Sequence, residues 1–207
     1  QQFGLRPGHW ILFFTLAGLA LRLQRLDFQP LWGDEGWSFY FAGQSLPQLL
    51  ALTAADIHPP LYYILLKTWL FIVGPGPEEA RFLSVIFGVA LIPVVAVLGQ
   101  RLFDGRVGAM AAAVTALMPL AIYYSQEVRM YGLVTLLGAM SVYSFIRATQ
   151  TLKVSSSSKW SLIYVATTTA ALYTMYYAIF IPLLQLLYLL VTYWQPQERR
   201  AHRSSIW

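Results

Sequence analysis

The segment 82–100, with the sequence FLSVIFGVALIPVVAVLGQ, contains no charged side chain. A transmembrane helix needs about 20 mainly apolar residues, because each residue adds about 1.5 Å along the helix axis. This segment is therefore predicted to cross a membrane. Five further stretches approach the same length: about 9–26, 107–124, 130–147, 160–176 and 178–194. We expect one all-α domain over 1–207, a polytopic membrane helical bundle of about six transmembrane helices, in which 160–194 could also form one long broken helix.

The composition also indicates a membrane protein. Of the 207 residues, 57% are hydrophobic and 11% are charged, whereas soluble domains are about a quarter charged. The chain contains 7 Trp and 13 Tyr, whose amphipathic rings favour the headgroup region of a bilayer. The formal net charge of +5 is scattered among apolar runs and forms no continuous basic face. A nucleic-acid partner is therefore not expected.

A seventh apolar stretch, 59–73, is too short for an ordinary span. It has 15 residues and carries Lys67 near its middle, which favours an interfacial or re-entrant helix. If it does not span, nine of the 14 Lys and Arg residues lie on one side of the membrane and seven of the nine Asp and Glu residues on the other. Because Lys and Arg collect in cytoplasmic loops, we expect the loop 27–79 and the short loop around Glu127 to lie together on the extracytoplasmic side.

The long outer loop contains two adjacent carboxylates, Asp34 and Glu35, in the sequence LWGDEGW (31–37). A carboxylate beside Trp rings at a membrane surface loses part of its hydration and becomes a better proton acceptor near neutral pH. One interpretation is therefore a general base. The other is structural: Asp34 caps a helix over 36–43, and Glu35 lies near the positive end of its dipole.

The same loop continues with DIHPPLYY (56–63). The two prolines fix an extended entry and then allow a helix to begin at Pro60, which places His58 at that entry. A histidine there can bind a phosphate or a substrate hydroxyl, or it can hydrogen-bond a loop carbonyl. The chain has no cysteine, and His9, His58 and His202 lack the spacing of a zinc site.

The second outer loop reads YYSQEVRMY (123–131) and places Glu127 and Arg129 between two apolar stretches. Charged groups so close to the lipid core are costly and tend to be functional. Residues two apart point to different sides of a helix, so we expect each to have another partner. The structural alternative is that Arg129 snorkels to a headgroup and Glu127 is a solvated loop acid. Arg81, at the outer start of its span, allows the same two interpretations.

Four motifs resemble, in order and spacing, the GT-C glycosyltransferases, above all the protein O-mannosyltransferase-like and aminoarabinose-transferase-like enzymes (glycosyltransferase family 39 type). They are WGDE (32–35), HPPLYY (58–63), RFLS (81–84) and YSQEVRMY (124–131). The resemblance covers about 10–150 well and extends weakly to 194. It implies an enzyme of the bacterial plasma (inner) membrane that transfers a sugar, with inversion, from a polyprenyl-phosphate carrier to an acceptor hydroxyl of a protein, lipid or glycan on the extracytoplasmic face.

The resemblance also implies roles for individual residues. Asp34 matches the catalytic acid of the first loop, with Glu35 beside it, and Glu127 matches the acid of the second loop. Arg129 and Arg81 would neutralise the departing polyprenyl phosphate as the bond breaks. The substrate-binding candidates are His58, Tyr62, Arg81, Arg129 and Tyr131. Some relatives use a divalent metal at the acidic loops, whereas the protein-mannosylating kind look metal-independent, so we expect no metal and no other cofactor.

Two other classes of protein are alternatives. A transporter would carry ionisable residues near the bilayer midplane on broken, repeated helices, whereas the expected spans after the first have no charged residue in their interiors. A lipid-binding module without chemistry could use the same outer loops. Enzymes of the GT-C type usually continue into further spans, so the 207 residues could be a catalytically incomplete part of a longer protein.

Overall fold

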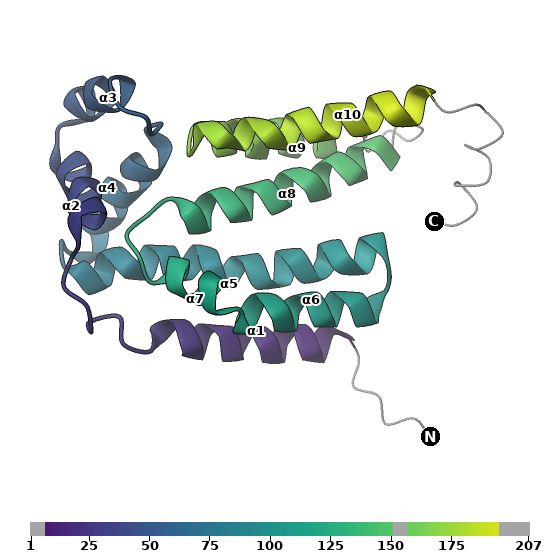
Figure 1. The fold of residues 1–207 in the computed structure, drawn as a ribbon, viewed down its shortest axis with the longest axis horizontal. Helices are drawn as coiled ribbons and strands as arrows, with labels where there is room; N and C mark the ends of the chain where they lie inside the picture. The colour runs from purple at the N-terminus through teal and green to yellow at the C-terminus, as the bar shows by residue number, and fades with distance from the viewer. Residues whose placement is uncertain (1–6, 151–156, 195–207) are drawn as a thin grey trace.

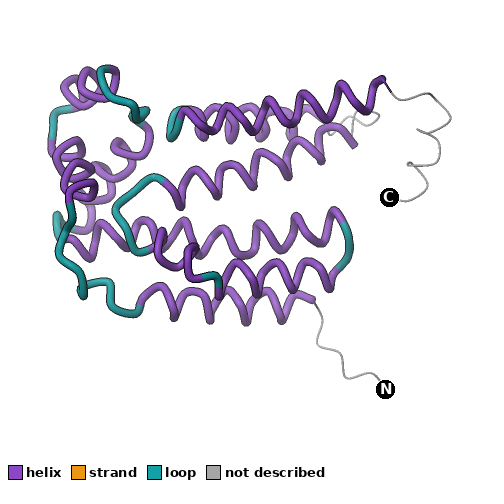
Figure 2. The backbone as a smooth tube through the Cα atoms, viewed as in Figure 1, coloured by secondary structure: helices purple, strands orange, loops and turns teal. Residues whose placement is uncertain are grey.

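The long helices of the chain lie side by side and give the molecule its length (Figure 1). The structure is a computed structural model that describes residues 7–150 and 157–194. Within these ranges every regular element is a helix (Figure 2), as the apolar stretches predicted. The long helices are α1 (Pro7–Leu23), α5 (Pro77–Leu102), α6 (Gly105–Leu117), α8 (Tyr131–Gln150), α9 (Ser157–Leu172) and α10 (Phe180–Trp194).

Three shorter helices form one end of the bundle: α2 (Gly33–Gly43), α3 (Leu46–Ala54) and α4 (Leu61–Val73) (Figure 1). The Leu61 amide, at the start of α4, donates a 3.0 Å hydrogen bond to the carbonyl of Tyr173, in the turn after α9. Lys67 donates to two backbone carbonyls at the end of α2, 3.2 and 2.7 Å from its Nζ. The stretch 59–73 therefore packs with the other loop helices, and its position at the membrane interface stays a prediction.

Two helices, α5 and α8, are long and apolar enough to cross a membrane. A third span is added if α6 and the short helix α7 (Pro119–Ser125) count together. The shorter apolar helices are Gly8–Leu23, Leu61–Val73 and Tyr176–Thr192, the last of which joins the 3-10 helix η1 (Tyr176–Ile179) to α10. The described part of the chain thus contains two or three span candidates, and the expected number of six is not confirmed.

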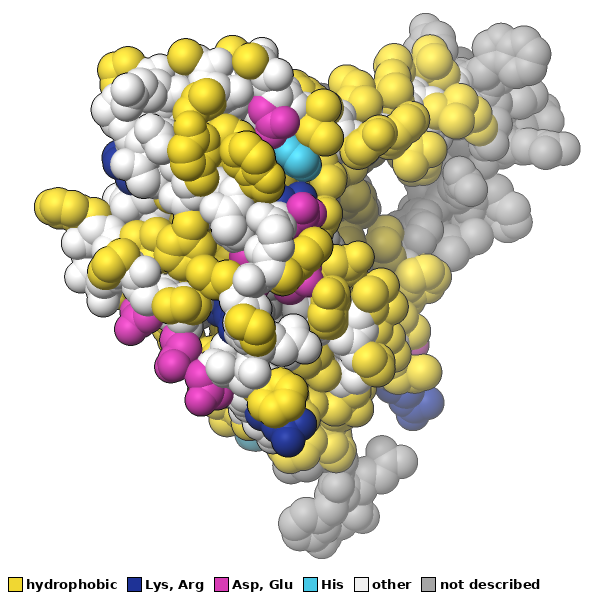
Figure 3. All heavy atoms as spheres, turned by 60° about the vertical axis from the view of Figure 1, so that its left-hand side comes forward, with side chains coloured by type: hydrophobic (Ala, Val, Ile, Leu, Met, Phe, Trp, Pro, Cys, Tyr) yellow, Lys and Arg dark blue, Asp and Glu magenta, His cyan; other side chains and the backbone are white. Residues whose placement is uncertain are grey.

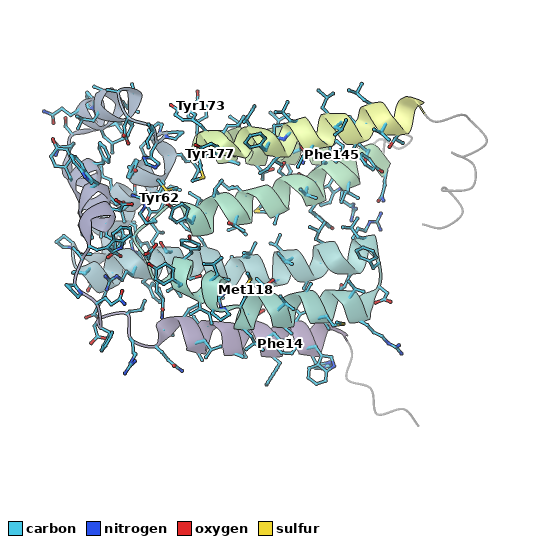
Figure 4. All side chains as sticks on the ribbon, viewed as in Figure 1. Phe14, Tyr62, Met118, Phe145, Tyr173 and Tyr177 are labelled. Carbon is cyan, nitrogen blue, oxygen red and sulfur yellow. The ribbon has the colours of Figure 1, made fainter. Side chains whose placement is uncertain are left out.

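The expected span 107–124 is divided by a break. α6 ends at Leu117, α7 begins at Pro119, and the two helices are bent by 58°. Met118 lies at the break (Figure 4) with an extended backbone, φ −63° and ψ 118°. Proline has no amide hydrogen, so Pro119 cannot donate to the carbonyl of Thr115 as a continuous helix would require. Pro119 was the sequence signal for this break, and the prediction of one span did not use it.

The two segments expected as the last spans form separate helices that fold back on each other (Figure 1). The hydroxyl of Tyr164 on α9 donates to Oε1 of Gln185 on α10 (3.0 Å). Nε2 of Gln185 donates to Oγ of Ser141 on α8 (3.2 Å), and the hydroxyls of Ser141 and Thr168 lie 2.7 Å apart. These buried polar contacts join three helices, and the turn between α9 and α10 excludes one long helix over 160–194.

The main core lies at the end of the bundle that α2, α3 and α4 cover. Its buried members come from these helices, from the starts of α5 and α8, and from the loop between α7 and α8, and include Phe41, Leu49, Tyr62, Tyr63, Leu66, Leu83, Val128 and Met130. Figure 3 shows charged side chains gathered at this end, whereas the visible sides of the long helices are mostly apolar. The core therefore holds the two acidic loops together, and the long helices present apolar surface outward.

Candidate active site

The two outer loops meet at the end of the bundle formed by α2, α3 and α4. Asp34 and Glu35 lie in the first turn of α2, where the helix dipole favours negative charge. The Val128 amide donates to Oε1 of Glu35 (2.9 Å), and Nη1 of Arg129 donates to the carbonyl of Asp34 (3.3 Å). The structure thus brings together the two acidic loops that the charge distribution had assigned to one side of the membrane.

Glu35 is buried and fully engaged by protein groups. It is 1% exposed and pairs with the guanidinium of Arg81, with Nε 3.0 Å from Oε1 and Nη2 2.8 Å from Oε2. This two-pronged arrangement is the strong form of such a pair. Because Oε1 also accepts the Val128 amide, the carboxylate is closed to an arriving hydroxyl group. The geometry favours a role for Glu35 in holding the two loops together, and its predicted catalytic role stays a prediction.

Arg81 lies on α5 and binds the beginning of the first loop through hydrogen bonds. Its Nη1 donates to the carbonyls of Leu26 (2.6 Å) and Gln29 (2.9 Å), and its Nη2 reaches that of Pro30 (3.5 Å). A guanidinium carries five N–H donors, and with the two bonds to Glu35 all of them point at protein acceptors. These contacts do not favour the predicted binding of a carrier phosphate by Arg81.

Asp34 differs from Glu35 because it is open to solvent. Its side chain is 47% exposed and forms an ion pair with Arg129, with 3.4 Å between Oδ2 and Nη2. It lies inside α2, whose N-cap residue is Trp32 and has no side-chain cap bond. Asp34 therefore does not cap this helix. A half-exposed carboxylate held beside a cation can accept a proton from a hydroxyl group that arrives from outside.

Arg129 is a buried cation at the edge of this site. It is 5% exposed, and its guanidinium lies over the ring of Tyr131, 5.6 Å from the centroid. Among the described residues its Nε has no hydrogen-bond partner. A buried donor without a partner costs free energy, and a charged acceptor would satisfy it. The alternative of simple snorkelling to a headgroup does not fit a side chain enclosed by protein.

Glu127 is buried at the edge of a pocket of about 400 Å³ between the end of α1 and α7. Burial, together with the nearby charge of Glu35, raises the pKa of Glu127 above the ordinary glutamate value, although a hydrogen bond from Tyr123 acts in the opposite direction. The other polar residues of the pocket are Gln24, Arg25, Gln29, Arg81, Tyr123 and Gln126. The alternative of a solvated loop acid therefore does not fit Glu127.

His58 lies just before α4 and pairs with Asp56, with 3.1 Å between Nδ1 and Oδ2. Burial acts to raise the pKa of Asp56, but hydrogen bonds from the Ile57 amide and from His58 lower it overall. The pair leaves Nε2 of the imidazole for another ligand. Over residues 7–150 and 157–194, no three His, Asp or Glu side chains gather as in a metal site, and the absence of a required metal stays a prediction.

The two tyrosines predicted to bind substrate lie in different settings. Tyr62 is a core residue (Figure 4) with 0% exposure, and burial raises the pKa of its hydroxyl, which faces Ser84. Tyr131 is partly exposed and contacts Arg129 as well as the ring of Tyr124, whose centroid is 4.7 Å away. Tyr131 can therefore reach a ligand at Arg129, whereas Tyr62 packs in the core and supports the site.

Sequence reasoning missed residues that shape the site. Tyr63 is almost fully buried and lies in the field of both Arg129 and Asp34; burial raises the pKa of Tyr63 to about 12. Tyr123 hydrogen-bonds Glu127. Both tyrosines stand inside quoted motifs, where Tyr62 and Tyr131 were named as candidates but Tyr63 and Tyr123 were not. Neither contact has a sequence signal, because each depends on how the loops fold.

Comparison with known proteins identifies the family. The family model for dolichyl-phosphate-mannose-protein mannosyltransferases matches residues 57–205, which is more than half of the chain. The match includes His58, Glu127 and Arg129 and begins after Asp34. No curated protein and no solved structure gives a significant match. The chain therefore belongs to the dolichyl-phosphate-mannose-protein mannosyltransferase family of the GT-C superfamily, as the four motifs predicted, and is a membrane glycosyltransferase.

Proposed function

We propose that this protein moves a sugar from a polyprenyl-phosphate donor to an acceptor hydroxyl, with Asp34 as the general base. The observation that carries the proposal is the contact between a half-exposed carboxylate and a buried guanidinium across two loops, Asp34 with Arg129. The family to which the chain belongs is described by a lipid-linked sugar, dolichyl-phosphate-mannose, which supports this class of donor. The acceptor is a protein, lipid or glycan that carries a free hydroxyl.

The reaction requires one proton transfer and one displacement. The carboxylate of Asp34 takes the proton of the acceptor hydroxyl while its oxygen attacks C1 of the sugar. The bond between C1 and the phosphate oxygen breaks, and the electron pair leaves with the polyprenyl phosphate. Negative charge grows on that phosphate, and it is neutralised by the guanidinium of Arg129, whose Nε has no hydrogen-bond partner among residues 7–150 and 157–194. Attack from the face opposite the phosphate inverts the configuration at C1.

Glu127, His58 and Tyr131 complete the proposed site. The neutral form of a buried carboxyl group can donate as well as accept a hydrogen bond, which suits Glu127 to a sugar hydroxyl in its pocket. His58 is oriented by Asp56 and offers Nε2 to a hydroxyl or phosphate. Tyr131 presents its ring beside Arg129, where it would cover the donor.

The proposal includes a membrane arrangement. The six long helices would each cross the bilayer, the broken pair α6 and α7 counting as one crossing, with α2, α3 and α4 at the extracytoplasmic surface. The polyprenyl tail would lie along the apolar sides of the long helices, and its phosphate would reach Arg129 at the surface. In a bacterium this membrane is the plasma (inner) membrane.

The test compares wild type with Asp34→Asn in transfer from dolichyl-phosphate mannose, with donor binding measured in parallel. We expect turnover to fall about 100-fold or more while the donor Kd stays near that of wild type. Arg129→Met is expected to weaken donor binding about tenfold or more, because it removes the cation for the phosphate. Asp27→Asn, an exposed acid of the same loop, is the matched control and should retain activity.

Three results would contradict the proposal. Equal turnover in Asp34→Asn and wild type would exclude Asp34 as the base. Donor binding without turnover in wild type would reduce the chain to a lipid-binding module, and loss of donor binding altogether would exclude a lipid-linked sugar as its ligand.

A further inference from the structure

Arg22 lies in the last turn of α1 and is completely buried, with 0% exposure. Its guanidinium donates to backbone carbonyls of Gly18 (3.1 Å), Thr115 (2.9 Å) and Ala116 (3.1 Å), and its Nε donates to Oγ of Ser125 (3.0 Å). A buried guanidinium is costly unless its donors are satisfied. The proposed reaction has no step for this residue, and its burial closes it to a lipid phosphate.

Two of these acceptors lie at the break between α6 and α7. In an uninterrupted helix the carbonyl of Thr115 would accept the amide of residue 119, but that residue is Pro119. The carbonyl of Ala116 belongs to the last turn of α6, where carbonyls have no donor within the helix. Arg22 therefore supplies, from a neighbouring helix, the donors that the break in the chain removes.

Glycines on two helices make room for this arrangement. A Cβ at Gly18 of α1 would lie 3.1 Å from Nη1 of Arg22. A Cβ at Gly88 of α5 would lie 3.2 Å from Nε of Arg22 and 2.0 Å from Oγ of Ser125. A larger residue at Gly88 would force Ser125 or Arg22 to move. The guanidinium is thus enclosed by α1, α5, α6 and α7 together.

The end of α1 and the end of α7 each donate hydrogen bonds to the other segment. Nε2 of Gln126, at the end of α7, donates to the carbonyls of Arg22 (3.1 Å) and Gln24 (2.7 Å) at the end of α1. Arg22 therefore caps the break of α6, and Gln126 caps the end of α1. Glu127 directly follows Gln126, and Arg129 is two residues further on.

We propose that Arg22 is a positioning residue that fixes the direction of α7 at the Pro119 break and thereby orients Glu127 and Arg129. The inference rests on the proposed function for its catalytic consequence, and on the hydrogen bonds alone for its structural part. Without the Arg22 side chain, α7 loses the hydrogen bond from Arg22 to Ser125 and can pivot at Met118, although Gln126 still donates to the backbone carbonyls at the end of α1.

The structural part is tested by hydrogen exchange of the backbone amides of 118–130 in the full chain. Arg22→Met should speed this exchange about tenfold or more, because bonds from a charged donor are lost. Pro119→Ala restores an amide for the carbonyl of Thr115, so adding it to Arg22→Met should bring the exchange back to within about threefold of Pro119→Ala alone. Arg22→Lys keeps the charge without the planar fork and should give an intermediate rate.

The control separates positioning from general loosening. Gln185→Leu removes the buried hydrogen bonds between α8, α9 and α10 and should speed exchange there while 118–130 stays as in wild type. In transfer from dolichyl-phosphate mannose, Arg22→Lys should lower kcat/KM about tenfold, and Gln185→Leu should stay within about twofold of wild type.

Unchanged exchange of 118–130 in both Arg22 variants would overturn the proposal, as would a double variant whose effects simply add. Faster exchange with unaltered kcat/KM would leave Arg22 a purely structural residue and overturn its positioning role. If wild type itself shows no transfer, the proposed function fails, whereas the exchange rates still decide whether Arg22 holds the break.

Discussion

Two neighbouring carboxylates of the first loop have opposite environments, and helix geometry explains why. Successive residues of an α-helix point about 100° apart, so Asp34 and Glu35 cannot share a face of α2. Glu35 turns inward to Arg81 and the Val128 amide, and Asp34 turns outward beside Arg129. One acid is thereby suited to holding the loops and the other to receiving a proton.

The buried pair gives the first prediction at the residue scale. Glu35→Gln leaves the guanidinium of Arg81 buried without its counter-charge, and breaking such a pair costs about 3–5 kcal/mol. For a chain of this size the melting temperature should fall by about 6 °C or more, as measured by thermal unfolding in detergent. Glu78→Gln, at an exposed acid of the first turn of α5, should leave it unchanged. Equal melting temperatures for Glu35→Gln and Glu78→Gln would show that the pair adds no stability.

The pKa of Glu127 gives a second prediction. Burial and the charge of Glu35 raise this pKa in the folded state, so ionisation of Glu127 opposes folding above its folded pKa. That cost disappears as the pH falls below the unfolded value of about 4.3. Glu127→Gln should therefore raise the melting temperature by about 2 °C or more at pH 8, with a difference from wild type that shrinks as the pH approaches 4. A difference that stays constant with pH would mean that the charge of Glu127 is not penalised.

The sequence identified the charged residues of the site but could not assign their partners. The Trp rings beside Asp34 and Glu35 marked these carboxylates as candidates, yet nothing in the spacing tells which acid turns inward. The partner of Glu35 lies 46 residues away at Arg81, and such a distant pairing leaves no local pattern. Both Arg81 and Arg129 were predicted to neutralise a phosphate. The protein uses the donors of Arg81, whereas Nε of Arg129 has no hydrogen-bond partner within the described part of the chain.

At the scale of the helices, the length and charge of a segment were informative, whereas the break within one segment was not predicted. The segment 59–73 was expected to lie at the membrane interface because it is short and carries Lys67, which stays a prediction; the structure shows that Lys67 caps the end of α2. The break at Met118 was not expected, although Pro119 stands in the middle of the stretch 107–124. A kink depends on whether a neighbour supplies the missing donor, and here Arg22 on another helix does so.

The packing of α5 against α7 gives the third prediction. Ala is a better helix former than Gly by about 1 kcal/mol, so Gly88→Ala in α5 should stabilise the protein if the site had space. The new Cβ would instead lie 2.0 Å from Oγ and 2.8 Å from Cβ of Ser125. We expect a net loss of about 1–3 kcal/mol in the free energy of unfolding and a displaced α7, seen as reduced transfer activity.

Gly132 of α8 provides the matched control for this substitution. A Cβ there would meet its nearest neighbours, the carbonyl of Ser84 and the Cβ of Phe87, at 3.5 and 3.6 Å, which is ordinary contact. Gly132→Ala should therefore be neutral or slightly stabilising. A Gly88→Ala variant as stable as Gly132→Ala would contradict the close fit between α5 and α7.

At the scale of the whole molecule, the arrangement of the helices makes the two ends of the bundle chemically different. One end carries α2, α3, α4 and both acidic loops, and the other carries the short turn between α5 and α6 (Figure 1). The count of Lys and Arg predicts that the second end lies on the cytoplasmic side. The exposed loop residue Ile57 lies at the first end, as does Tyr173, whose carbonyl accepts the amide of Leu61. Phe103 is exposed at the other end.

Labelling of single cysteines tests this arrangement without background, because the chain has no cysteine of its own. In intact cells a membrane-impermeant thiol reagent should label Ile57→Cys and Tyr173→Cys alike, and Phe103→Cys only after permeabilisation. If α4 crossed the bilayer, Ile57→Cys and Tyr173→Cys would react from opposite sides, and the pairing of the two acidic loops would fail in the membrane. If Phe103→Cys alone reacted in intact cells, the helix arrangement would stand but Asp34 and Arg129 would face the cytoplasm, where an extracytoplasmic acceptor could not reach them.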